Sequence, residues 1–301
     1  MKPFRSSLLI LIACASTPGF AVPVLAPELA SFGVLGGSAV TNTGPSIVIG
    51  NLGVSKNSSL SGITGFFGTL ANDGPGIAIG AVHHADAFAT TADTELVAAI
   101  NLLALLGPGT GLGADLAGFT LKPGVYTVTA GASNLTGALT LDGGGNVNAL
   151  WVFQMPSTLI TSPGSTVNVI NTGAGAGVYW NVGSSATLDT NTTFEGNILA
   201  SASISMNDGV RLICGRALAN TGAVTMINDF VDAVGCVGTG EEGSNGLNGA
   251  PVIIPPGGPV PEPGTLAIFV LGLAGLALTR RNGRSVRRNA GASRLAKGTA
   301  L

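Results

Sequence analysis

Apolar and polar residues alternate over short runs through the middle of the chain. In each run aliphatic side chains occupy every second position, and mostly threonine or serine lies between them. A period of two places the aliphatic side chains on one face of a β-strand and the hydroxyl groups on the other. The pattern therefore predicts many short strands buried on one face. The clearest runs are Leu139-Thr140-Leu141, Thr158-Leu159-Ile160-Thr161, Thr187-Leu188-Asp189-Thr190, Ser203-Ile204-Ser205-Met206 and Ala223-Val224-Thr225-Met226.

One phrase, a glycine, a polar residue and then mainly apolar positions, occurs three times. A unit of this kind buries its apolar face only against neighbouring copies, which predicts a β-solenoid. The spacing between successive runs is uneven, so the coils are expected to be irregular. Because one copy lies far upstream of the others, we expect the N-terminal coil to stack beside the C-terminal coils. The copies are Gly50-Asn51-Leu52-Gly53-Val54-Ser55, Gly196-Asn197-Ile198-Leu199-Ala200-Ser201 and Gly215-Arg216-Ala217-Leu218-Ala219-Asn220.

A different period occurs between Ala81 and Leu106, where glycine and proline are absent. Apolar residues recur there at intervals of three and four, which predicts one amphipathic helix over about 81–106. Gly107-Pro108-Gly109 would end it. We expect this helix to pack lengthwise on one solenoid face and to leave its carboxylates in water, namely Asp86, Asp93 and Glu95.

Charge is distributed unevenly along the chain. Of 13 basic residues, two lie before the first apolar run and seven lie in the last 22 residues, whereas all 15 acidic residues lie between Glu28 and Glu262. The body therefore carries a formal charge of about −11. Such a body is a poor partner for nucleic acid, which the sequence excludes as a ligand.

The first 21 residues are typical of a secretory signal peptide. Lys2 and Arg5 precede an apolar stretch, and the small residues Gly19 and Ala21 precede the predicted cleavage point. An alternative is a lipoprotein cleavage box that ends at Cys14. The protein is therefore expected to be exported.

Two cysteines remain after removal of the signal peptide. In an oxidising compartment Cys214 and Cys236 are expected to form a disulfide that closes the end of the solenoid, with two buried thiols as the alternative.

The C-terminus has three parts: Pro261-Glu262-Pro263, an apolar helix over 265–279, and an arginine-rich tail. Fifteen apolar residues are fewer than the ~20 that a stable membrane helix needs. This segment resembles the PEP-CTERM sorting signal, in which a membrane-embedded exosortase recognises the Pro-Glu-Pro motif and the helix is removed. The tail runs on to Leu301, beyond the usual end of such signals, and an ordinary membrane tail is the alternative. A Gly/Pro-rich linker over 240–259 separates this signal, 260–301, from the body, 22–239.

Several segments of the body together resemble the microbial ice-binding proteins. The resemblance spans about 31–230, and it implies a discontinuous right-handed β-solenoid with one flanking helix. The matching segments include Phe32-Gly33-Val34-Leu35-Gly36-Gly37-Ser38-Ala39-Val40-Thr41-Asn42-Thr43, Leu121-Lys122-Pro123-Gly124-Val125-Tyr126, Trp151-Val152-Phe153-Gln154 and Trp180-Asn181-Val182-Gly183-Ser184-Ser185-Ala186-Thr187-Leu188.

Catalytic groups are sparse. His83 and His84 would point about 100° apart on a helix and could not chelate one metal ion. The acids are scattered singly, which is unfavourable for a glycosidase or lyase. Oxygen-bearing residues alternate from Asp142 to Asn148, as in a calcium loop, although a glycine-rich turn explains them more simply. The sequence thus predicts no catalytic residue, no metal ligand, no cofactor and a protein that is not an enzyme.

Ice binding requires a flat, rigid and weakly hydrated surface. Threonine presents a hydroxyl and a methyl group and is stiff at χ1, so it loses little entropy against a lattice. We expect such a face to bind an ice crystal, with matrix adhesion to an exopolysaccharide as the alternative and a polysaccharide-active enzyme as a third. The predicted face comprises Thr136, Thr140, Thr158, Thr161, Thr187, Thr190, Ser203, Ser205, Thr221 and Thr225.

Overall fold

The structure is a computed structural model that describes residues 24–128, 132–173 and 175–234. Residues 1–253 and 254–301 form separate units, and every described residue belongs to the first. The predicted signal peptide, the linker, Cys236 and the sorting signal with its apolar helix lie outside the described residues. Within the described ranges, no helix is both long and apolar enough to span a bilayer.

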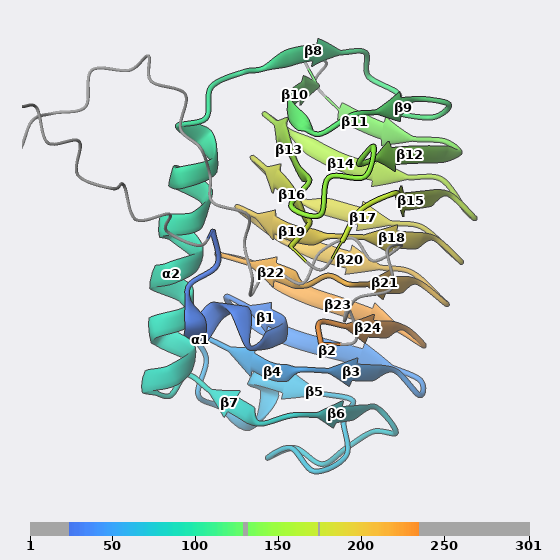
Figure 1. Cartoon of the computed structure of the whole chain (residues 1–301). Coiled ribbons are helices and arrows are strands. Elements are labelled where there is room, and N and C mark those ends of the chain that lie inside the picture. The colour runs from blue at the N-terminus through green and yellow to red at the C-terminus, as the bar shows by residue number, and fades with distance from the viewer. Residues whose placement is uncertain (1–23, 129–131, 174, 235–301) are drawn as a thin grey trace, which may run out of the picture. The chain divides into compact units, whose positions relative to one another are not determined.

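Three parallel sheets, here called A, B and C, form the walls of a solenoid (Figure 1). Sheet A has nine strands, in the order β7 (Val82–His84), β4 (Asn51–Val54), β1 (Phe32–Gly36), β22 (Ala217–Ala219), β19 (Asn197–Ala200), β16 (Gly177–Val182), β13 (Leu150–Met155), β10 (Gly124–Val128) and β8 (Thr110–Leu112).

Sheets B and C have seven and eight strands. The order in sheet B is β11 (Ala132–Leu135), β14 (Thr158–Thr161), β17 (Ala186–Leu188), β20 (Ile204–Met206), β23 (Ala223–Ile227), β2 (Ala39–Thr43) and β5 (Ile63–Thr64). The order in sheet C is β6 (Ile77–Ile79), β3 (Ile47–Ile49), β24 (Phe230–Asp232), β21 (Arg211–Ile213), β18 (Thr193–Glu195), β15 (Thr166–Ile170), β12 (Ala138–Asp142) and β9 (Thr120–Leu121).

The coils are stacked in an order that differs from their order in the sequence. Strands β1 to β7 build one end, helix α2 (Ala87–Ala104) leads to β8 at the other end, and the later coils return to meet the first (Figure 1). Accordingly β1 pairs with β22, β2 with β23 and β3 with β24, all in parallel. The predicted stacking of N-terminal beside C-terminal coils is confirmed, whereas the right-handed winding implied by the resemblance stays a prediction.

The interior is filled by the aliphatic side chains of the alternating runs and by a column of aromatic rings. Tyr126, Phe153 and Trp180 occupy the same register position on β10, β13 and β16. The ring centroids of Phe153 and Trp180 lie 4.1 Å apart, and those of Trp180 and Phe194 lie 4.7 Å apart. Equivalent positions of successive coils thus stack on one another, which is how weakly apolar single coils share one core.

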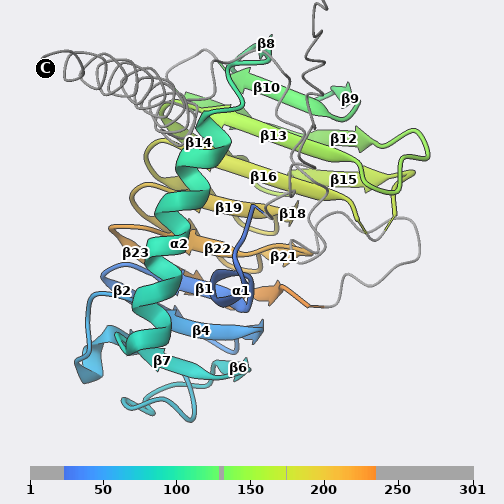
Figure 2. The same cartoon turned by 60° about the vertical axis from the view of Figure 1, so that its left-hand side comes forward.

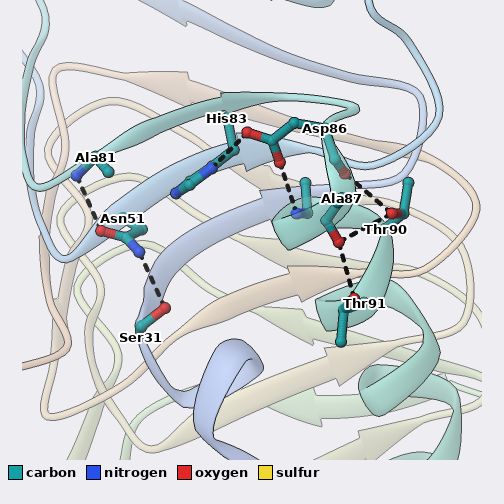
Figure 3. Close-up of polar contacts among 9 residues, drawn as sticks. Ser31, Asn51, Ala81, His83, Asp86, Ala87, Thr90 and Thr91 are labelled. Carbon is teal, nitrogen blue, oxygen red and sulfur yellow. Dashed lines mark hydrogen bonds and ion pairs between the residues drawn. The ribbon is translucent and has the colours of Figure 1, made fainter.

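The repeated phrase marks the corner where the chain enters sheet A. Gly50 and Gly196 have φ angles of +129° and +106°, a backbone conformation that favours glycine. The polar residue that follows each glycine links neighbouring coils. Asn51 accepts from the N–H of Ala81 at 2.9 Å and donates to Ser31 Oγ at 3.0 Å (Figure 3).

Helix α2 runs along the outer side of sheet A (Figure 2). Its buried side chains Ala92, Leu96 and Leu103 belong to one apolar cluster with Val152 and Tyr179 of that sheet. A second helix, α1 (Pro27–Ala30), contacts α2, and a short 3-10 turn, η1 (Leu60–Gly62), precedes β5.

The predicted helix boundaries differ from the observed ones. Residues 82–84 form the edge strand β7, and the helix begins only at Ala87, because Asp86 supplies its N-cap. His83 and His84 therefore lie on a strand, not on a helix. The Asp86 carboxylate accepts from the N–H of Ala89 at 2.9 Å and lies 2.8 Å from Nδ1 of His83 (Figure 3).

Of the three helix carboxylates predicted to lie in water, Asp86 is exposed, whereas Asp93 and Glu95 are half-buried. Asp93 accepts from Ser55 Oγ and from Lys56 Nζ, both at 3.1 Å, and Glu95 accepts from the N–H of Leu29 at 2.7 Å. Asp93 thus ties the helix to the loop after β4, and Glu95 ties it to α1.

Loss of the N-cap is expected to destabilise the protein. Partial desolvation raises the pKa of Asp86, but the hydrogen bonds from Ala89 and His83 outweigh it, so the pKa is lowered overall. Asp86→Ala should lower the free energy of unfolding by about 0.5–2 kcal/mol, measured by chemical denaturation. Asp86→Asn keeps a capping oxygen and should lose clearly less; equal losses would contradict the capping role.

Candidate functional site

The outer face of sheet A is already occupied. Leu35, Leu199 and Leu218 point away from the solenoid interior and are buried in the cluster that includes helix α2. Sheet A is therefore unsuitable for contact with a large external surface.

Sheet C has an outer face of mixed character. Its strands contain four charged residues, Asp142, Glu195, Arg211 and Asp232. The guanidinium of Arg211 lies 4.8 Å from the centre of the Phe230 ring. Charged groups hold a strong hydration shell, so this face would be costly to place against a neutral crystal.

Sheet B differs because none of its strands contains a charged residue. One outward position repeats on every strand, and pairing places these residues in a single row. Each of them is half-buried or exposed. Here called the central row, it comprises Asn134, Ile160, Thr187, Ser205, Thr225, Thr41 and Thr64.

The outward positions of sheet B repeat in two directions, across the strands and along each strand. Neighbouring strands are about 4.8 Å apart, and outward positions recur at about 6.7 Å along a strand. The hydroxyl oxygens of Thr41 and Thr225, on adjacent strands, are 3.4 Å apart. A second outward row runs beside it and includes Thr158 on β14 and Ala223 paired with Ala39. Ser203 directly precedes β20 on the same side.

Four of the predicted face residues lie in the outward rows of sheet B, namely Thr158, Thr187, Ser205 and Thr225, and a fifth, Ser203, directly precedes β20. Two other predicted members do not lie on this face. Thr140 lies on β12 in sheet C, because the chain turns a corner between β11, which belongs to sheet B, and β12. Thr161 is on β14 but points inward, is 1% exposed and pairs its hydroxyl with Thr192 Oγ1 at 2.8 Å.

The remaining predicted threonines lie at turns. Thr136 directly follows β11 and lies outside the strand. Its N–H donates to the Asp115 carboxylate at 3.1 Å. Thr190 follows β17, and its N–H donates to Asp189 at 2.8 Å. Thr221 precedes β23 and donates to the carbonyl of Ser201 at 2.9 Å. These three residues border sheet B without belonging to its rows.

Four residues of the central row were not predicted: Asn134 and Ile160, and the two threonines of the N-terminal coils, Thr41 and Thr64. The alternation of Ala39-Val40-Thr41-Asn42-Thr43 was visible in the sequence and could have placed Thr41. Thr64 lies in a strand of only two residues, which is too short to give a periodic pattern. Both belong to the N-terminal coils, and their place beside Thr225 depends on long-range stacking.

Acidic residues near the face are engaged in local hydrogen bonds. Asp189, which directly follows β17, accepts from Asn207 Nδ2 at 2.9 Å, a contact that together with Thr190 lowers the pKa of its carboxyl. At the glycine-rich turn over 142–148, Asp142 accepts from Lys122 Nζ at 2.6 Å and from Asn171 Nδ2 at 2.9 Å, and these contacts lower the pKa of Asp142 to about 2. The turn interpretation therefore accounts for the Asp142 carboxylate. No cluster of three or more metal-ligating side chains occurs among the described residues.

A solenoid of three parallel sheets, with one helix along sheet A and an uncharged, threonine-rich outer row on sheet B, defines the class of protein. The Ice-binding-like family model matches residues 34–232, and the PEP-CTERM protein-sorting motif matches residues 259–281. The chain belongs to the Ice-binding-like family. The resemblance found in the sequence is thereby confirmed for both segments.

Individual relatives agree with this assignment. An ice-binding protein of Nostoc sp. (strain HG1) is 49% identical over 197 residues, which cover 65% of this chain and 69% of that protein. The crystal structure of an ice-binding protein from the Antarctic ascomycete Antarctomyces psychrotrophicus superposes with a TM-score of 0.61 at 35% identity, over 68% of this chain and 95% of that one. An ice-binding protein from an Antarctic biological consortium gives a TM-score of 0.62 at 33% identity, over 77% and 95%.

Proposed function

We propose that this protein binds ice through the outer face of sheet B, without catalysis. The observation that carries the proposal is the contrast among the three faces. Helix α2 covers sheet A, four charged residues interrupt sheet C, and the strands of sheet B present hydroxyl, amide and aliphatic groups with no charge. The relatives described as ice-binding proteins support the same ligand.

The physical reason lies in the rigidity of this face. Thr187, Thr225 and Thr41 are β-branched, so each side chain has few rotamers to lose on contact with a crystal. Main-chain hydrogen bonds on both sides of β17, β20, β23 and β2 fix the spacing of the rows. Weakly hydrated methyl groups beside hydroxyl groups can share water with the ice lattice at low desolvation cost.

The proposal is tested by ice-crystal shaping and recrystallisation inhibition with the exported protein. An unrelated protein at equal mass serves as the control. Faceted crystals and small grains are expected. Round crystals that grow as in the control would refute ice binding. Adhesion to an exopolysaccharide, which no feature of the described residues supports, would then be tested next.

Export and processing complete the proposal. The C-terminal PEP-CTERM motif indicates an exported or surface protein. We infer that the signal peptide over 1–21 is removed, that an exosortase-type enzyme acts at Pro261-Glu262-Pro263, and that the segment 265–279 resides in the inner membrane only before processing.

We further propose the Cys214–Cys236 disulfide. Cys214 is 2% exposed, carries no free thiol and follows β21, which pairs with β24 up to Asp232. Cys236 lies only four residues beyond Asp232 in the sequence. Reduction should lower the free energy of unfolding by about 2–4 kcal/mol, measured by denaturation with and without reductant. The variant Cys236→Ser should behave like the reduced protein; unchanged stability in both would contradict the pairing.

A further inference from the structure

A buried polar chain crosses the coils beneath the corner between sheets B and C. It begins at Asn42, whose side chain is buried and donates to the carbonyls of Gly44 and Gly65, each at 2.8 Å. Ser46, also buried, donates to Asn42 Oδ1 at 2.6 Å and accepts from the N–H of Asp229 at 2.8 Å. This chain therefore links the coils of β5, β2 and β23.

Asp229 extends the chain to a fourth coil. It is 2% exposed, and its two carboxylate oxygens hold backbone groups of different coils. Oδ2 accepts from the N–H of Ile227, the last residue of β23, at 2.8 Å, and Oδ1 accepts from the N–H of Val210, beyond β20, at 2.9 Å. The four linked coils carry Ser205, Thr225, Thr41 and Thr64 of the central row.

We propose that Asp229 is a positioning residue for the ice-contact face, holding the rungs β20, β23 and β2 at the spacing that the ice lattice requires. The proposal rests on the assignment of ice binding to sheet B. Its physical basis is that a charged acceptor holds two N–H groups more tightly than a neutral one, and a protonated carboxyl has lost one of its acceptor sites.

The ionisation of Asp229 offers a test without mutation. Burial raises the pKa of Asp229 to about 7, and the neighbouring charge of Asp208 adds to the rise. The other charged groups of this corner point elsewhere: Arg211 lies over Phe230 on the outer face of sheet C, and the Asp232 carboxylate accepts from the N–H of Val234. Between pH 5 and pH 9 the carboxyl therefore changes from mostly protonated to mostly ionised.

Stability and ice binding should respond to pH in opposite directions. Because the folded state keeps the Asp229 proton to a higher pH than the unfolded chain does, this group stabilises the fold most below its ordinary pKa, and that contribution is lost as the pH rises through about 7. Ice binding needs the ionised carboxylate, so it should be about tenfold weaker at pH 5 than at pH 9. A merely structural residue would move both quantities in the same direction.

The experiment measures partition of the fluorescently labelled exported protein into growing ice, with unfolding by denaturant at the same pH values. Asp229→Asn should bind ice weakly at both pH values. Its stability should lack the pH dependence that the Asp229 carboxyl contributes. Asp208→Asn, which removes the neighbouring charge on an exposed position, should keep the amplitude of the ice-binding profile and move its midpoint to lower pH.

Each outcome decides between the two proposals. A flat ice-binding profile, or one that follows stability, would overturn the role of Asp229 while leaving ice binding by sheet B intact. Failure of sheet B substitutions to affect ice binding would instead overturn the assignment of the face itself.

Discussion

Replacing Thr225 with tyrosine is expected to reduce ice affinity by about tenfold or more, because the ring would stand above the central row and keep Thr41 and Ser205 from the crystal. Thr225 is exposed at the middle of sheet B and contributes nothing to the core, so the fold should persist. Thr187→Tyr, on β17 of the same row, should act in the same way. Partition into ice and crystal shaping measure the loss, and circular dichroism and denaturation check the fold.

The matched control is Thr140→Tyr. Like Thr187, Thr140 is a half-buried threonine within a strand, and Thr120 and Asn168 flank it on the neighbouring strands, but it lies on sheet C. Its replacement should leave ice affinity unchanged. An equal loss in Thr140→Tyr, or full activity in Thr225→Tyr, would show that sheet B is not the contact face.

Replacing Arg216 with methionine is expected to destabilise the protein more than any substitution on the surface. Arg216 is fully buried, and burial lowers the pKa of its guanidinium to about 10. Nε donates to the carbonyl of Ala30 at 2.9 Å, Nη1 to Asn197 Oδ1 at 2.8 Å and Nη2 to the carbonyl of Ala233 at 3.1 Å. The side chain thus joins α1, the corner before β19 and the end of the last coil.

Methionine would leave these three acceptors buried without their donor. The expected loss is about 3–5 kcal/mol in the free energy of unfolding, or roughly 10 °C in Tm. Arg211→Met is the matched control, since Arg211 is exposed on sheet C and its guanidinium lies over the Phe230 ring in a cation–π arrangement worth about 0.5–1 kcal/mol. Equal losses for the two variants would contradict the role of Arg216 as a link between coils.

Much of the architecture followed from local patterns. The alternation around Leu188, Ile204 and Val224 correctly separated core-facing from outward-facing side chains, because a strand has a side-chain period of two. The glycine-free segment correctly predicted a helix, although the helix begins at Ala87 and not near residue 81. The reason is that the periodic pattern does not register the capping carboxylate of Asp86, which fixes the start of the helix.

The composition of the candidate face was harder to predict. Thr140 and Thr161 satisfy the same local pattern as Thr187, yet one lies on another sheet and the other points inward. A run of two or three outward residues does not indicate which of the three sheets its strand joins. That depends on the number of residues between successive corners, which is irregular in this chain.

The sequence by itself determined the strand pattern, the stacked coils, the long helix α2, the family and the sorting motif, because each depends on residues that are close together in the chain or on a recognisable motif. Only the tertiary structure decided which threonines share a row. Thr41 and Thr225 are 184 residues apart and adjacent in sheet B because the N-terminal coils complete a stack begun by the C-terminal ones. The same stacking brings Asn42, Ser46 and Asp229 together, since hydrogen bonds between coils require neighbours in space and not in sequence.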